Sequence, residues 1–448
     1  MAACDSYDEF TTDPSASLIF SEDIVDFDTV LTTEGSSTRT LLVHNKGAKG
    51  LRISSVLLGA GADSPFRVNV DGQYLDGGYG SDFEVRTHDS IFVRIECTLP
   101  ETDKDEVTHY KESLTFVLES GTRQTVSLAA IGMDAYRVSS YTVDDDMVVE
   151  SARPILVDGT LTVDEGATLT LKAGTRLFFR SNASLLVKGT LKVEGEENKP
   201  VVMRGDRTDR LLPYIPYDNL PNRWNGITFE PTSSGNSLVW LDLHSARYGI
   251  RAVDTDITLE SCIFHNIAGR DSATSHGIFL KNCELVANNT SISNVMAHAL
   301  YLWGGTAHLT HCTMAQYLLI SGGSKGSALH VADKEGSATC EIADLVFDRC
   351  LVMGYGSDVI SASFVDPVSR SQRISFNECY LNTVKDEEDT RFTSCVYDID
   401  EARKRGNEGQ SPALRGLYRL FDTQLYLYDF TPAEGSPCEG YGAVFERQ

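Results

Sequence analysis

The first third of the chain is a succession of short runs in which apolar and polar residues alternate. A period of two is the pattern of a β-strand with one buried face, and turn-forming residues separate the runs. Seven or so short strands within about 120 residues are typical of a β-sandwich. We therefore predict a sandwich over residues 15–137, with its clearest strands at 38–45, 51–57, 66–70, 90–96, 113–118 and 125–131.

From about Tyr141 onward the chain becomes repetitive. Gly159-Thr-Leu-Thr-Val163 returns as Gly189-Thr-Leu-Lys-Val193. Short β-rich units that recur every 20 to 40 residues or so predict a β-helical solenoid. Further along, a six-residue pattern recurs five times, at 259–264, 280–285, 309–314, 347–352 and 376–381. It consists of an apolar residue, two polar residues, a cysteine, a variable residue and a second apolar residue.

A solenoid turn is too small to hold its own core, so its inward residues must stack on those of the neighbouring turns. Small cysteines suit such a narrow interior. Asn266 and Asn294 are expected at bends, where their side-chain amides would form a ladder.

The run from Gly159 to Phe179 resembles the opening turns of the right-handed parallel β-helix family, also called pectin-lyase-like. The segment Glu434–Gly442 resembles the last turn of that family before its cap. The resemblance implies a right-handed parallel β-helix over residues 138–448, with a capping C-terminal segment. The expected fold class is all-β, a sandwich followed by this solenoid.

The predicted sandwich has a resemblance of its own. Leu42-Val-His-Asn-Lys-Gly47, the strand around Ile53 and Phe66-Arg-Val68 resemble the immunoglobulin-like domains of microtubule-associated and bacterial surface proteins. On surface proteins such domains are usually spacers or docking modules, and the resemblance implies this role for residues 15–137.

Charge and cysteine spacing exclude several classes of protein. The 448 residues carry 39 Lys and Arg against 64 Asp and Glu, a net charge of −25, which disfavours a nucleic-acid partner because phosphate contacts need clustered cations. No apolar run approaches the ~18 to 20 residues of a spanning helix. The ten cysteines form no CxxC pair, so zinc ribbons are excluded, and we expect no metal and no cofactor.

The first residues suggest an anchor. Met1-Ala-Ala-Cys4 resembles the end of a bacterial lipobox, and the acidic stretch Asp5–Phe10 resembles the export signal of Bacteroidetes-type surface lipoproteins. The resemblance implies a lipid on Cys4, a linker over residues 1–14 and a location on the outer face of the outer membrane.

One column of polar and aromatic residues is a candidate binding site. Tyr248, His276, His298 and Ser327 occupy the same place in successive repeats, so the two histidines should lie about 5 Å apart, the spacing of neighbouring strands. Tyr301 and Trp303 follow His298 and would add a stacking wall. We interpret the column as a glycan-binding groove or a histidine acid–base pair; a solvated ladder at a strand edge is the alternative.

Two insertions interrupt the repeats. Residues 204–224 are rich in Arg, Tyr and Pro, as contact surfaces often are; this loop either binds sugar rings or a protein, or folds back over the solenoid. The second insertion, 384–390 with 398–408, is a charged surface rather than a cation site. The candidate contact residues of the first are Arg207, Arg210, Tyr214, Tyr217, Arg223 and Trp224.

These features lead to three hypotheses. Asp242, Asp254 and Asp256 are scattered instead of forming the carboxylate cluster that a polysaccharide lyase or glycosidase needs. The leading hypothesis is therefore a non-catalytic surface lipoprotein that binds a glycan or docks onto an outer-membrane protein assembly. The alternatives are a polysaccharide lyase or glycoside hydrolase that uses His276, His298 and Arg247, and a structural subunit of an outer-membrane complex.

Overall fold

The computed structural model describes residues 9–212, 215–271, 273–318, 321–355, 358–366, 373–398, 430–432 and 434–445. Cys4 and Tyr214, two of the predicted functional residues, lie outside these ranges. The chain divides into two compact units, residues 1–135 with 207–213 and residues 136–206 with 214–448. No helix in the described part of the chain has the length and apolarity needed to cross a bilayer.

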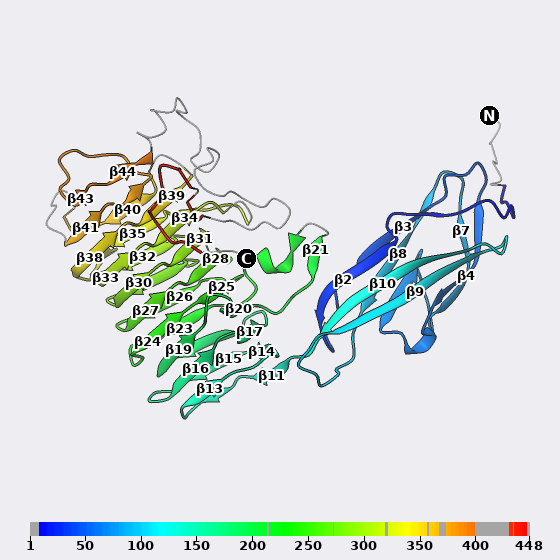
Figure 1. Ribbon diagram of the computed structural model, residues 1–448, viewed down its shortest axis with the longest axis horizontal. Coiled ribbons are helices and arrows are strands. Elements are labelled where there is room, and N and C mark those ends of the chain that lie inside the picture. The colour runs from blue at the N-terminus through cyan, green and yellow to red at the C-terminus, as the bar shows by residue number, and fades with distance from the viewer. Residues whose placement is uncertain are drawn as a thin grey trace. The chain divides into compact units, whose positions relative to one another are not determined.

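The first unit consists of two five-stranded sheets (Figure 1). Neighbouring strands are antiparallel, except that β2 and β10 run parallel. A short 3-10 turn, η1 (Gly61–Asp63), connects two of the strands. One sheet has the order β1 (Ile19–Phe20), β3 (Arg39–His44), β8 (Ser90–Cys97), β5 (Phe66–Val70), β6 (Gln73–Tyr74), and the other β2 (Ile24–Leu31), β10 (Arg123–Met133), β9 (Thr108–Leu118), β4 (Leu51–Leu58), β7 (Tyr79–Val85).

Alternation along the strands creates the core between these sheets. In β8, Ile91, Val93 and Ile95 are buried while Phe92 and Arg94 face outward. The same period runs through the other long strands, so each sheet presents one apolar face. The predicted all-β fold of this part of the chain is therefore confirmed, as a domain of two mostly antiparallel sheets.

The second unit is a parallel β-helix, as predicted (Figure 1). Most turns contribute one strand to each of three parallel sheets, here named A, B and C in chain order. Sheet A contains β11 (Tyr136–Ser139), β14 (Ile155–Asp158), β17 (Arg176–Phe179), β20 (Val201–Gly205), β25 (Leu241–His244), β28 (Ile263–Ile267), β31 (Ser291–Val295), β34 (Thr313–Gln316), β39 (Leu351–Gly354), β42 (Tyr380–Leu381) and β44 (Val396–Tyr397).

Sheets B and C complete the turns, and short elements lie between them. Sheet B contains β12 (Thr142–Val143), β15 (Thr160–Val163), β18 (Ser184–Val187), β23 (Ile227–Phe229), β26 (Ile250–Val253), β29 (Ile278–Lys281), β32 (Leu300–Trp303), β35 (Leu329–Ala332) and β40 (Ile360–Ser363). Sheet C contains β13 (Met147–Val149), β16 (Thr168–Lys172), β19 (Thr190–Glu194), β24 (Asn236–Val239), β27 (Asp256–Glu260), β30 (Glu284–Asn288), β33 (Gly305–Thr310), β38 (Ile342–Asp348), β41 (Ile374–Asn377) and β43 (Phe392–Thr393). The connections hold β22 (Ile215–Pro216), the 3-10 turn η2 (Tyr217–Asn219), β36 (Lys334–Glu335) and β37 (Ala338–Thr339). Strand β21 (Arg210–Leu212) belongs to the first unit.

The interior of the β-helix is built from columns of like residues. In sheet C, Phe347, Phe376 and Phe392 stack on successive turns with ring centroids 4.6 and 4.7 Å apart. Because the parallel register places each residue over its counterpart one turn away, a short apolar repeat is enough to form a continuous core. In sheet B the column is Leu185, Ile227, Ile250, Ile278, Leu300, Leu329 and Ile360.

The cysteine repeat marks the corners of the β-helix. Four of its five cysteines lie at the corner between sheets C and A, whereas Cys283 lies between β29 and β30, at the corner of B and C. A residue with a left-handed backbone precedes each of the four, for example Arg349 with φ of 50° before Cys350. The Cys350 thiol donates to the Leu309 carbonyl of the previous turn at 3.6 Å. None of the nine cysteines in the described ranges forms a disulfide.

The predicted asparagine ladder is wrong. Asn266 and Asn294 do lie at left-handed bends of β28 and β31, with φ of 53° each, and both are buried. Yet neither side-chain amide atom of Asn294 has a hydrogen-bond partner among the described residues. The left-handed bend, rather than an amide ladder, accounts for asparagine here, because asparagine tolerates positive φ better than most residues.

The C-terminal segment does not form the last turn that its sequence resembles. Residues 442–444 cross the outer face of sheet A, where the Gly442 N–H donates to the Arg349 carbonyl at 2.8 Å and the Ala443 N–H to Thr313 Oγ1 at 2.9 Å. The Val444 N–H donates to Asn289 Oδ1 at 2.8 Å. This segment and the loop around η2 cover different parts of sheet A, which also carries Asp242, His244 and His265.

Glycines allow the turns to approach closely where sheet A leads into sheet B. A Cβ on Gly249 would lie 2.2 Å from the Gly277 carbonyl oxygen of the next turn. Because the obstacle is backbone, Gly249→Ala is expected to destabilise the β-helix by about 3 kcal/mol. Urea unfolding followed by tryptophan fluorescence measures this. The control Val286→Ala, at a side chain 46% exposed, should change stability by less than about 0.5 kcal/mol; equal midpoints would contradict the prediction.

Candidate functional site

The outer face of sheet B carries a row of polar and aromatic side chains. The register places one residue of each turn over the next, and the row begins with Thr228 and Arg251. Phe279, Tyr301 and His330 follow on β29, β32 and β35. The row therefore combines rings with hydrogen-bonding groups at the spacing of adjacent strands.

The predicted histidine column lies beside this row. His276 and His298 precede β29 and β32, and their rings stack with centroids 5.4 Å apart and an interplanar angle of 6°. Backbone bonds connect the column, because the Gly249 N–H donates to the His276 carbonyl and the Gly277 N–H to the His298 carbonyl. The spacing thus agrees with the expectation from the repeat.

His330 extends the column to three histidines, and sequence reasoning missed it. Its ring stacks on His298 with centroids 4.5 Å apart, and Tyr301 meets all three rings edge-on at 4.7 to 5.5 Å. The repeat placed Ser327, and no histidine, after His298 in the column. His330 enters instead from β35, where it lies over Tyr301 in the register. We call His276, His298 and His330 the histidine stack.

The histidine stack is uncharged at neutral pH. Burial lowers the pKa of His276 to about 4 and that of His298 to about 3, since a low-dielectric site disfavours the imidazolium. Nδ1 of His276 accepts the His298 N–H at 3.3 Å, and Nδ1 of His298 accepts the Ser327 N–H at 3.0 Å. The neutral rings of His276 and His298 must therefore carry their protons on Nε2.

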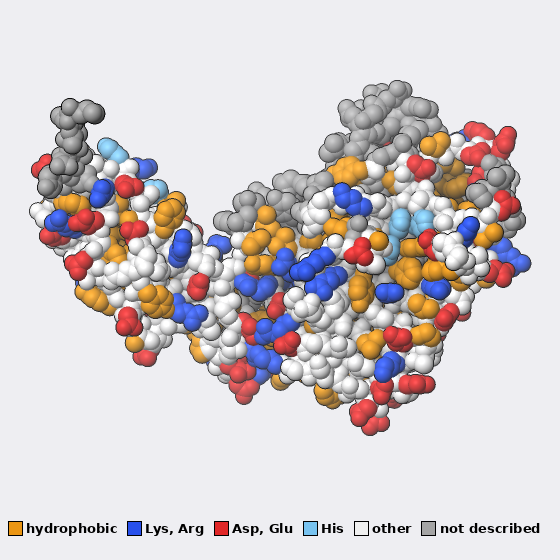
Figure 2. Space-filling model, turned by 180° about the vertical axis from the view of Figure 1, so that it is seen from behind, with side chains coloured by type: hydrophobic (Ala, Val, Ile, Leu, Met, Phe, Trp, Pro, Cys, Tyr) orange, Lys and Arg blue, Asp and Glu red, His pale blue; other side chains and the backbone are white. Residues whose placement is uncertain are grey.

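Carboxylate and hydroxyl groups hold the third ring of the stack. His330 lies 2.7 Å from Ser361 Oγ through Nδ1 and 3.4 Å from Glu335 through Nε2. Burial and the same Glu335 raise the pKa of Tyr301 far above its usual value, so its hydroxyl remains a donor. Figure 2 shows histidine side chains gathered on the β-helix surface beside hydrophobic ones.

Trp303 provides a further ring next to the stack. The Lys281 ammonium lies 4.4 Å from the centre of this ring, a cation–π contact. Trp303 Nε1 is buried and has no hydrogen-bond partner among the described residues. A buried donor without a partner is uncommon.

Trp224 is not a contact residue, contrary to the prediction. Its side chain is fully buried in the β-helix, where it stacks on Phe179 with ring centroids 4.2 Å apart. Its Nε1 donates to the His244 carbonyl at 2.9 Å. A large aromatic ring that fills a core position cannot contact a ligand. The composition of the 204–224 insertion therefore gave a wrong prediction for Trp224, its last residue.

The other residues of this insertion have different surroundings. Arg207 binds Asp209 and Ser37 within the first unit, and Arg210 lies 3.9 Å from Asp28. In the second unit, the Arg223 guanidinium lies over the Tyr217 ring at 5.4 Å. The structure therefore separates these predicted residues into two groups, and neither group includes the histidine stack.

Arg247 and Tyr248 lie at the corner that leads to β26. Nε, Nη1 and Nη2 of Arg247 each donate to the side-chain oxygen of one asparagine, namely Asn222, Asn225 and Asn182, at 2.7 to 2.9 Å. The Tyr248 hydroxyl lies 3.1 Å from Thr228 Oγ1. These contacts fix Arg247 in place at the start of the sheet B row.

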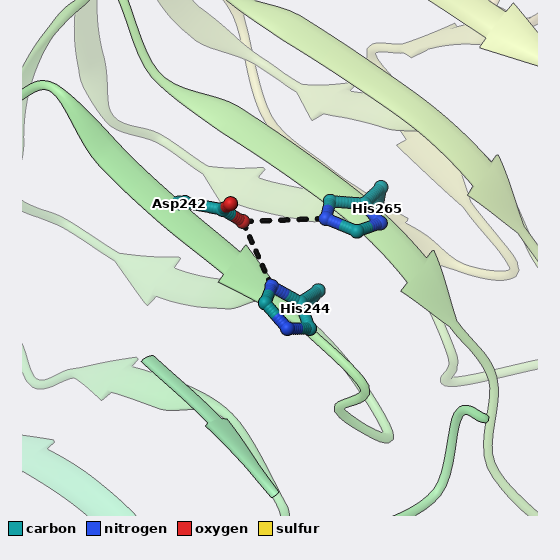
Figure 3. Close-up of side chains that lie close together, drawn as sticks. All are labelled: Asp242, His244 and His265. Atoms are coloured by element: carbon teal, nitrogen blue, oxygen red, sulfur yellow. Dashed lines mark hydrogen bonds and ion pairs between the residues drawn. The ribbon is translucent and has the colours of Figure 1, made fainter. Parts of the chain in front are cut away.

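A second cluster, which the sequence did not reveal, lies on sheet A (Figure 3). Asp242 and His244 extend from β25 and His265 from β28. Asp242 Oδ1 lies 2.8 Å from Nδ1 of His244 and 3.2 Å from Nε2 of His265. On the far side of His244, Nε2 lies 2.6 Å from Asp218 Oδ1, and Arg204 Nη1 lies 2.9 Å from the same carboxylate oxygen.

Opposite charges balance within this cluster. Burial disfavours ionisation of Asp218, but His244 and Arg204 outweigh it and hold the pKa of this carboxyl at about 2. The pKa of Asp242 is likewise lowered by the two histidines despite burial. Burial opposes the charge on His244, yet Asp218 and Asp242 together raise its pKa to about 9. Asp242, expected to be one of several scattered carboxylates, is thus in contact with both histidines.

The fold and its two sites define a two-unit all-β protein with a parallel β-helix. No known family matches the sequence, and no curated protein matches it. Solved structures similar to parts of the chain include the exopolygalacturonase of family 28 from Yersinia enterocolitica, at 9% identity over 80% of this chain and 96% of that one, with a TM-score of 0.21.

Two further solved structures show a similar degree of likeness. The catalytic domain of a GH87 α-1,3-glucanase in complex with nigerose is 9% identical over 81% of this chain and 88% of that one, with a TM-score of 0.19. The ASH / PapD-like domain of human CEP192 is 14% identical over 30% of this chain and 97% of that one, also with a TM-score of 0.19. Likenesses this distant say nothing about activity.

Proposed function

We propose that the β-helix binds a polysaccharide along the outer face of sheet B without cleaving it. The single observation that carries this proposal is the histidine stack with Tyr301 against it and Phe279 5.0 Å from Tyr301. The apolar faces of sugar rings pack on aromatic rings, and their hydroxyls need fixed donors and acceptors. The neutral imidazole of His298, whose Nδ1 accepts the Ser327 N–H, carries its proton on Nε2 and supplies such a donor.

The extent of the row suits a chain rather than a single sugar. Thr228, Arg251, Phe279, Tyr301 and His330 occupy five successive turns. At about 4.8 Å between strands, they span roughly 19 Å. Arg251 and Lys281 add positive charge to this face of a chain whose net charge is −25, which favours glycans that contain uronic acids.

The same row argues against cleavage as the main activity. Glycosidases place two carboxyl groups about 5 to 9.5 Å apart across the scissile bond. Along the described strands of sheet B, this outward row carries no Asp or Glu from Thr228 to Ser361. Glu335, from β36, approaches the stack, but it is engaged with His330 and Tyr301.

Binding assays on variants that lack one aromatic side chain test the proposal. The full chain is titrated calorimetrically with a panel of neutral and uronic-acid polysaccharides. We expect saturable binding, which Phe279→Ala and Trp303→Ala each weaken about tenfold, or about 1.4 kcal/mol, while Val286→Ala on sheet C leaves it unchanged. Absence of binding throughout, or equal affinities for all variants, would refute it. Release of reducing ends or unsaturated sugars would favour the hydrolase or lyase alternative.

We also propose that Cys4 anchors the protein to the outer face of an outer membrane, so that the β-helix meets its glycan at the cell surface. The support is the sequence around Cys4. Labelling of the protein with a fatty-acid analogue in its host, abolished by Cys4→Ser, is the expected result. Stoichiometric recovery of outer-membrane proteins with the tagged chain would favour docking onto an assembly instead.

A further inference from the structure

We propose that Asp242, His244 and His265 form a binding site for a divalent transition metal of the Zn²⁺ type on the outer face of sheet A. The ligand atoms are Oδ1 of Asp242, Nδ1 of His244 and Nε2 of His265, the three atoms that converge in Figure 3. This inference does not depend on the polysaccharide proposal, because the two sites lie on different sheets.

The spacing of the three side chains fits one small cation. One ligand atom from each lies within 4.8 Å of the others, and Asp242 Oδ1 is 2.8 and 3.2 Å from the two imidazole nitrogens. Zn²⁺ binds imidazole nitrogen and carboxylate oxygen at about 2.0 to 2.2 Å, which separates tetrahedral ligands by about 3.3 Å. The two carboxylate–imidazole distances lie within about half an ångström of this value, and the two imidazole nitrogens, no more than 4.8 Å apart, need to approach each other by about 1.5 Å at most.

A second carboxylate orients one of the ligands. His244 Nε2, on the far side of the ring from the proposed ion, lies 2.6 Å from Asp218, and Arg204 holds Asp218 at 2.9 Å. Metal-binding histidines usually direct their other nitrogen to a carboxylate, which fixes the tautomer and strengthens the ligand. Asp218 is therefore a positioning residue, contributed by η2 from the loop between β20 and β23.

The ligand set selects the kind of metal. Two imidazoles and one carboxylate suit Zn²⁺ and its transition-metal neighbours, whereas Ca²⁺ and Mg²⁺ prefer oxygen ligands only. The side chains of Asp242 and His265 are 28% and 18% exposed, so solvent reaches the site. Three protein ligands leave a fourth position to water.

Without a metal, the same residues form a hydrogen-bonded chain of alternating carboxylates and imidazoles. A bound ion must displace the proton that His244 otherwise directs to Asp242, because a metal-bound nitrogen carries none. The experiment must therefore distinguish metal binding from this proton-only network.

Metal titrations of the full chain make that distinction. Chelator-stripped, tag-free protein is titrated with Zn²⁺ and with Co²⁺ at neutral pH. We expect one equivalent to bind, and the bound Co²⁺ to show the visible bands of four-coordinate nitrogen and oxygen ligation without thiolate charge transfer. Asp242→Asn and His265→Gln should abolish this binding, and Asp218→Asn should weaken it about 10- to 100-fold.

A matched pair elsewhere on the β-helix provides the control. His308 on β33 and Asp344 on β38 lie 3.0 Å apart on sheet C. His308→Gln should leave metal binding unchanged. Circular dichroism shows whether each stripped variant is folded. If the wild-type protein binds no Zn²⁺ at micromolar concentration, or if Asp242→Asn and His265→Gln bind as the wild type does, the proposal is overturned.

Discussion

Trp224→Ala is expected to destabilise the β-helix by about 4 kcal/mol, within the range for removing a buried tryptophan. The ring has 0% exposure and stacks on Phe179 at an interplanar angle of 8°. Its removal leaves a large cavity and deprives the His244 carbonyl of its donor. Urea unfolding, followed by circular dichroism, measures the difference.

Two further variants separate packing from hydrogen bonding at this position. Trp224→Phe keeps an aromatic ring against Phe179 but loses the donor, so a smaller cost of about 1 to 2 kcal/mol is expected. Val286→Ala reports the effect of a surface change on the same β-helix. An unfolding midpoint for Trp224→Ala that matches the Val286→Ala midpoint would show that the ring does not support the core.

Mild acid should destabilise the β-helix through the histidine stack. The pKa of His276 falls from an ordinary 6.5 to about 4 on folding. Below pH 6.5 the unfolded chain gains a proton that the folded chain lacks, so stability declines as the pH drops from about 6.5 to 4. Each pKa unit corresponds to about 1.4 kcal/mol, which sets an upper limit of about 3.5 kcal/mol for this residue. Unfolding free energies measured across that range test this.

The neighbours of His276 determine how the control is chosen. The positive charge of Arg251 lowers the pKa of His276 further, and so does that of His330 once it is protonated. The negative charge of Asp271 raises the pKa of His276. His276→Gln retains a hydrogen-bond acceptor but cannot titrate, so its stability should vary less with pH between 4 and 6.5. Exposed His308→Gln should keep the wild-type slope. The same slope in all three proteins would contradict the assignment.

The β architecture was predictable because both units follow simple periods. Strand β5 occupies exactly the predicted residues 66–70, and the cysteine repeat marks real corners. Strand β7 was missed because Gly80, Ser81 and Asp82 interrupt its alternation, and Asp82 has a φ of 63°. Strand β2 was also absent from the predicted strands, and Asp28 within it has a left-handed backbone, with φ of 56°.

The cluster on sheet A could not be found from the sequence because the length of a turn varies. The register pairs Asp242 with Ile263 after 21 residues, but Ile263 with Ser291 after 28. A repeat of unequal length does not specify which polar residues become neighbours. His276 and His298 were identified because each is followed by the same short motif of a small and an aliphatic residue. His330 and Asp218 lie at positions that no repeated motif marks.

The bond between Val444 and Asn289 joins residues 155 positions apart. In a solenoid whose turns contact only their neighbours, the terminal turns can unravel one at a time. A segment that crosses β34 and β39 adds long-range contacts to this otherwise local topology. The turns beneath it must therefore open together, and amide hydrogen exchange there should show one shared opening free energy instead of a gradient toward the end of the β-helix.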